Sequence, residues 1–148
     1  MRILHTLAVM FIGSFIIQYF FMSTIMTNSM ENITNSLGKV YLSVLMGLYM
    51  MVLEVMMHDH HYDVFSMKYY IFIGCLIMFF VYLYKTQKYI TDKEYVKEMI
   101  EHHSMALLTS NKILEKTDNY NVSKLAKNII QNQEDEIRDM KEILNKIK

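Results

Sequence analysis

The stretch ILHTLAVMFIGSFIIQYFFMSTIM, residues 3–26, contains no Asp, Glu, Lys or Arg. A helix of about 20 apolar residues is long enough to cross the hydrocarbon core of a bilayer. The run is too long for a signal peptide, and no small-residue cleavage motif follows it. We therefore expect a retained membrane-spanning helix at residues 3–26.

Two further apolar runs follow, at residues 40–57 and 69–84. Lys68 and Lys85 flank the later run, and tyrosines lie near both of its ends. Lysine and tyrosine are typical of the boundary between membrane and water. The sequence therefore predicts three transmembrane helices, which makes the first part of the chain a membrane domain.

The charged residues are divided unevenly along the chain. Residues 85–148 hold 12 of the 15 Lys and Arg and 11 of the 15 Asp and Glu. Net charge is near zero in both parts, so nothing indicates binding to nucleic acid.

The single cysteine, Cys75, lies in an apolar run, which excludes an intrachain disulfide and a Cys-x-x-Cys metal site. We expect a membrane domain at 1–87 and a soluble domain at 88–148.

The soluble part has the pattern of a two-helix hairpin. Thr91 and Glu94 form a capping box, after which apolar residues recur every three or four positions up to Leu114. A break at 117–121 precedes a second apolar stripe, with Asn119 or Asn121 as its cap. We expect an all-α protein whose two amphipathic helices pack antiparallel. A second copy could complete a ferritin-like bundle, and docking on the membrane helices is the alternative way to bury their apolar faces.

Candidate metal ligands lie on the first of these helices. At 100° per residue, Met99 and His103 share a narrow arc on the buried side, and His102 lies at its edge. A buried imidazole needs a hydrogen-bond partner or a metal ion. In an antiparallel hairpin, the late part of the second helix faces this arc. It carries further donors: Gln133, Glu136 and Met140.

Thioethers bind Cu(I) well and zinc poorly, whereas imidazole binds copper in both oxidation states. The pattern therefore predicts a copper site, Cu(I) above all, with zinc or another divalent ion as the alternative. Met99, His102, His103 and Met140 are the expected ligands, with Gln133 and Glu136 orienting them or binding in addition. The competing interpretation is that the methionines fill the core and His103 is a satisfied core histidine.

A second group of histidines, His58, His60 and His61, follows the second apolar run and is expected in a loop. These side chains could bind copper, zinc or nickel, or they could be solvated residues that change the charge of the loop with pH. Glu54 is the one acid inside an apolar run. An intramembrane acid is often functional, but one this close to the end of a span can also reach the interface.

No enzyme motif is present. Di-iron bundles need Glu-x-x-His pairs, whereas Met99 and Ile100 stand three residues before His102 and His103. The chain also lacks a nucleophile elbow, a P-loop and a His-Glu-x-x-His pattern. We therefore do not expect an enzyme.

The helical tail resembles the bacterial domain-of-unknown-function-305 family, whose signature is close to Met-Ile-Pro-His-His, then Ala-Ile and a later Gln-x-x-Glu-Ile-x-x-Met. The whole chain looks like a small membrane-anchored branch of that family. The corresponding residues here are Met99-Ile100-Glu101-His102-His103, Ala106-Leu107 and Gln133 to Met140, with Leu125-Ala126 and Ile129-Ile130 between them.

The resemblance implies a ferritin-like bundle, copper binding through His and Met, and a tail on the periplasmic or extracellular side of a bacterial inner membrane. Two residues depart from the family pattern. Glu101 stands at the usual proline, and Thr109 stands where many members have another methionine. The positive-inside rule disagrees with the family, because lysines near the spans place the tail in the cytoplasm.

The leading hypothesis is a membrane-anchored protein that sequesters Cu(I) or hands it to an unknown partner, aiding metal tolerance. The alternative is a structural or regulatory membrane protein whose tail forms homo-oligomers or docks on a partner without metal. A third hypothesis is a metal-transporter subunit that uses Glu54 and the methionine-rich spans.

Overall fold

The computed structural model describes residues 3–147, and every regular element in that range is helical. The expected all-α fold is confirmed. Contacts divide the chain into two compact units. The first runs to Phe21 and resumes over Leu37–Tyr89, and the second joins Met22–Ser36 to the residues from Ile90 onward. In chain order the elements are α1 (Ile3–Ile16), the π-helix η1 (Ile17–Met22), α2 (Ser23–Met26), the 3-10 helix η2 (Met30–Asn32), α3 (Leu37–Tyr62), α4 (Met67–Lys85), α5 (Asp92–Leu114) and α6 (Tyr120–Lys146).

Three stretches are long and apolar enough to cross a membrane: Ile3–Met26, α3 and α4. The three predicted apolar helices are therefore present, as candidate membrane spans at the expected places in the chain. Large apolar side chains on these helices point outward, among them Val9 at 68% exposure and Phe72 at 60%. So many outward apolar groups suit lipid far better than water.

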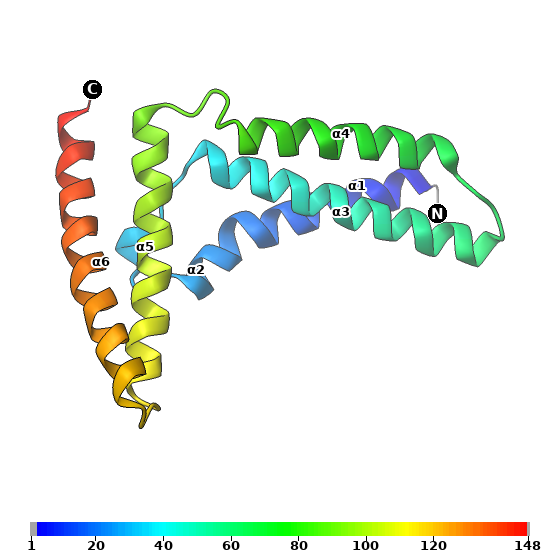
Figure 1. Cartoon of the computed structure of the whole chain (residues 1–148). Helices are drawn as coiled ribbons and strands as arrows, with labels where there is room; N and C mark the ends of the chain where they lie inside the picture. Colours follow the sequence, from blue (N-terminus) through cyan, green and yellow to red (C-terminus); the bar gives the residue numbers. More distant parts are fainter. Residues whose placement is uncertain (1–2, 148) are drawn as a thin grey trace. The chain divides into compact units, whose positions relative to one another are not determined.

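Helix α3 organises the first unit by packing against both α1 and α4 (Figure 1). The core of this unit consists of Leu7, Leu48, Val55 and Ile73. Gly47 permits the close approach of α1, since a Cβ atom at this position would lie 2.7 Å from Cδ2 of Phe11. Small residues at such contacts are typical of helices that pack within membranes.

The end of α3 differs from the sequence-based expectation. The helix continues to Tyr62 and includes His58, His60 and His61, so the prediction of a loop there is wrong. Asp63 takes a left-handed conformation with φ of 49°, and the amide of Val64 donates to the carbonyl of Asp59 across 3.1 Å. This is the hydrogen bond of a Schellman cap, which allows the polar sequence to complete the last helical turn.

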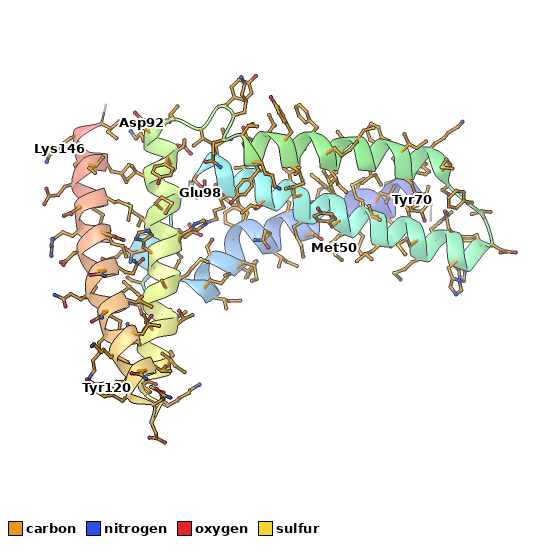
Figure 2. The ribbon with its side chains drawn as sticks, in the orientation of Figure 1. Met50, Tyr70, Asp92, Glu98, Tyr120 and Lys146 are labelled. Carbon is orange, nitrogen blue, oxygen red and sulfur yellow. The ribbon has the colours of Figure 1, made fainter. Side chains whose placement is uncertain are left out.

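In the second unit, α5 and α6 run side by side in opposite directions (Figure 1). Figure 2 shows Asp92 and Lys146 at one end of the pair and Tyr120 at the other. The predicted caps are present, because Thr91 accepts from the amide of Glu94 at 3.4 Å and Asn119 accepts from that of Asn121 at 2.9 Å. The buried core of the pair is Val96, Ile100, Leu107 and Ile137.

The second unit also contains residues 22–36, which lie outside the soluble domain predicted from the sequence. Residues 22–36, which include the last turn of the first candidate span and the link to the second, pack against α5 through α2 and η2. Helix α5 is therefore covered by α6 on one side and by this polar segment on another. The segment and the tail consequently fold together.

Candidate metal-binding site

His103 is the best-defined member of the predicted copper site. Its Nδ1 atom lies 2.9 Å from Oε2 of Glu136 on α6, and its side chain is only 18% exposed. His103 therefore lies on the side of α5 that faces α6, as the helical arc predicts, and its role as a metal ligand stays a prediction. The contact has the distance of an ion pair but not the geometry of a hydrogen bond, so Nδ1 is a buried atom without a well-directed hydrogen-bond partner.

Glu136 also accepts a hydrogen bond from its own helix. Nε2 of Gln133 donates to the same Oε2 atom across 3.2 Å. One carboxylate oxygen thus lies within reach of both an imidazole and an amide group. Glu136 itself is 53% exposed, so the pair lies at the margin of the helix interface, with water on one side.

The two methionines follow from the register of the hairpin. Because α5 and α6 are antiparallel with the same rise per residue, the His103–Glu136 contact places the position four residues earlier on α5 level with the position four residues later on α6. These positions are Met99 and Met140. Both side chains are half-buried, and Met140 packs against the aliphatic core.

His102 lies apart from this group, because its side chain is exposed to solvent. The structure therefore brings His103, Gln133 and Glu136 into contact, aligns Met99 with Met140 and leaves His102 outside. Among residues 3–147, no three His, Cys, Asp or Glu side chains are grouped closely enough to hold a metal ion. A metal ion here would depend on thioether ligands beside the imidazole.

The donor set still fits a soft ion better than a hard one. Two thioethers at one level and an incompletely satisfied buried imidazole are suited to Cu(I). Oxygen ligands are few, which argues against Ca²⁺ or Mg²⁺ at this position.

Sequence reasoning missed the role of Glu101 and Ser104, which are buried on the side of α5 that faces residues 22–36. Glu101 accepts from the hydroxyl of Ser23 and from the amide of Thr34, the latter across 3.0 Å. Ser104 Oγ accepts from the amide of Asn28 at 3.0 Å and from the side chain of Asn32 at 3.2 Å. The only signal in the sequence was a loop rich in Ser, Thr and Asn.

The second histidine group lies on the last two turns of α3, not in a loop. His58 is half-buried, whereas His60 and His61 are exposed. Glu54 is half-buried on the same helix, one turn before His58. These residues belong to the first unit and are distinct from the tail site.

Comparison with known proteins gives a relationship but no activity. Residues 83–147 match the family described as Domain of unknown function (DUF305). The chain is 34% identical to "Uncharacterized protein L153" of Acanthamoeba polyphaga mimivirus over 139 residues, which are 94% of this chain and 91% of that protein. No solved structure matches the chain. The chain therefore belongs to the same family as the mimivirus protein, and its residues 83–147 are a domain of the DUF305 type.

Proposed function

We propose that this chain is a membrane-anchored protein that binds Cu(I) in its helical tail, either to sequester the ion or to pass it to a partner in metal tolerance. The observation that carries the proposal is His103 at the α5–α6 contact, with Met99 and Met140 level with each other one turn away by the register of the hairpin. His103 Nδ1 is buried there without a well-directed hydrogen bond.

His103 and the two thioethers would hold the ion, and Gln133 and Glu136 would orient the imidazole from the second helix. Such an orienting carboxylate fixes the tautomer and the direction of a metal-binding histidine. The bound ion would supply a soft Lewis-acid centre, which the chain's own residues keep between two helices. His102, being exposed, is suited to meet an incoming ion or a partner that receives it.

We place the tail on the side of the membrane away from the reducing cytosol. Residues 22–36 and the tail form one compact unit, so they lie on the same side, as three crossings require. A methionine and histidine site avoids the thiol oxidation that disables cysteine sites in an oxidising compartment. The relative comes from a mimivirus and not from a bacterium. We therefore propose only the side of the membrane on which the tail lies, and we do not propose that the membrane is bacterial.

The test is a Cu(I) titration of the full chain in detergent micelles against a competing chelator. We expect the triple substitution Met99→Leu, His103→Ala and Met140→Leu to weaken binding by on the order of tenfold or more, because three donors are lost. Leucine conserves the volume of methionine, so its effect on folding is small. Substituting Met78→Leu is the matched control, since Met78 is 67% exposed on α4.

Two results would separate the competing hypotheses. Unchanged Cu(I) affinity in the triple variant would overturn the site. The tail would then be an interaction module whose defining contact is that of Glu101 and Ser104 with residues 22–36. If the site exists, single substitutions at His103 should weaken binding more than those at His102, because only His103 faces α6. Cu(I) should also raise the melting temperature of the chain, since an ion that binds only the folded state stabilises it.

A further inference from the structure

The end of the first unit that holds the last turns of α3 contains a cavity of about 640 Å³. Thr6 of α1 lines it from one side, and Glu54, His58 and His61 of α3 line it from the other. The remaining lining residues are Ile3, Met57, His60 and Tyr62. The lining thus offers three imidazoles and a carboxylate, which are the donors of a metal site and not those of a lipid groove.

The helical course of α3 brings these donors to one face. Residues four and seven positions apart lie above one another on a helix, so Glu54, His58 and His61 are neighbours along one stripe. A loop beginning at residue 58 would not have aligned them. The Schellman cap at Asp63 therefore has a direct consequence for the cavity, because it extends the helix through both histidines.

His58 is oriented from behind by a carboxylate. Its Nδ1 atom lies 3.2 Å from Oδ1 of Asp59, which is only 7% exposed. Asp59 is fixed in turn, since it accepts from the amide of Ser66 at 2.7 Å and from its hydroxyl at 2.6 Å. An ionised carboxylate can only accept, so this contact favours the tautomer with the proton on Nδ1, which leaves the lone pair of Nε2 available. Metal-binding histidines are oriented in this way.

One aromatic ring contacts both imidazoles. The ring centroid of Tyr62 lies 4.7 Å from that of His58 and 4.8 Å from that of His61. The two histidines are therefore neighbours of the same side chain at the end of the helix. Their rings and the Glu54 carboxylate do not yet converge on one point, because no three such groups among residues 3–147 are close enough to hold an ion. Binding requires rotation of these side chains.

We propose that this cavity binds a divalent transition-metal ion, with Zn²⁺ as the probe, through the imidazoles of His58 and His61 and the carboxylate of Glu54. Two nitrogens and one oxygen suit Zn²⁺, Ni²⁺ or Cu²⁺ and differ from the thioether donors of the tail. The site is separate from the proposed Cu(I) site and does not depend on it.

The experiment uses the full chain in detergent micelles, carrying Met99→Leu, His102→Ala, His103→Ala and Met140→Leu so that the tail cannot contribute. Zn²⁺ is titrated against a competing chelator. We expect one Zn²⁺ per chain, with affinity lowered by on the order of 100-fold when His58→Ala and His61→Ala are added. Asp59→Asn should lower it by about 10–100-fold, the range for an orienting carboxylate. His5→Ala is the control, because His5 is an exposed histidine of α1 outside the cavity lining.

Unchanged affinity in the His58→Ala and His61→Ala variant would overturn the proposal. Glu54→Gln keeps the size of the side chain and serves as a second variant that leaves the helix end intact. Its circular dichroism should match that of the parent, while its Zn²⁺ affinity falls. Equal affinity in Glu54→Gln and the parent would remove the carboxylate from the site. Failure of the Cu(I) titration would leave this result untouched, since the tail donors are already absent.

Discussion

The two covered sides of α5 are built from different chemistry. Toward α6 it presents Val96, Ile100 and Leu107, which join Ile137 in an aliphatic core. Toward residues 22–36 it presents Glu101 and Ser104, whose oxygens accept hydrogen bonds from that segment. Aliphatic packing is non-directional and tolerates changes of the same volume, whereas a buried acceptor tolerates only another acceptor in the same place. One helix is thus held by burial on one side and by directed bonds on the other.

The largest effect should come from the aliphatic side. Ile100 is 1% exposed, so Ile100→Ala removes buried methyl groups and leaves a cavity. We expect a loss of about 2–5 kcal/mol in the stability of the second unit. Amide hydrogen exchange of the full chain in micelles should become faster across both α5 and α6. Ile113→Ala is the control, because Ile113 is 40% exposed. Equal exchange in the two variants would contradict the assigned core.

The polar side should give a smaller and more local effect. Ser104 is fully buried and accepts from both Asn28 and Asn32. Ser104→Ala leaves these donors without that acceptor and should cost about 1–3 kcal/mol. Exchange should accelerate chiefly at residues 22–36, while the α5–α6 core stays protected. Thr109→Ala removes an exposed hydroxyl from the same helix and should change neither region. Loss of protection in α6 as well would show that the two sides are not independent.

The smallest effect on stability is expected at the margin of the α6 side. Glu136 is 53% exposed, so its pairing with His103 contributes at most about 1 kcal/mol. Glu136→Gln should shift the melting temperature of the metal-free chain very little. Cu(I) affinity should nevertheless fall, because the carboxylate orients the imidazole. A large loss of stability with no change in Cu(I) affinity would identify the pair as structural.

The aliphatic side of this comparison could be predicted from the sequence, and the polar side could not. Apolar residues at helical spacing predicted both helices of the tail, and uncharged runs predicted the three spans, because each signal is local. The hydrogen bonds to Glu101 and Ser104 join residues 67 to 78 positions apart in the sequence. A local pattern of apolar residues cannot predict such distant pairs. Glu101 illustrates the limit, since it appeared in the sequence only as a departure from the family's proline.

The positions of the candidate ligands could likewise be predicted only in part. The helical arc predicted that His103 faces α6, but it also placed His102 at the edge of the arc, and the structure leaves that side chain in solvent. The polar residues after Met57 indicated a loop, yet the chain remains helical as far as Tyr62. The cause is the capping hydrogen bond from the Val64 amide to Asp59 and the bonds of the Asp59 carboxylate to Ser66, contacts that depend on the turn that follows.

The docking of residues 22–36 on α5 has a consequence for how the chain is made. The two parts leave the ribosome far apart in time, and two membrane crossings, α3 and α4, are inserted between them. If only one of these helices entered the bilayer, the segment and the tail would end on opposite sides and the second unit could not close. The polar donors of the segment and the acids of α5 would then stay in water, visible to proteases. The second unit can therefore fold only when both α3 and α4 have been inserted into the membrane.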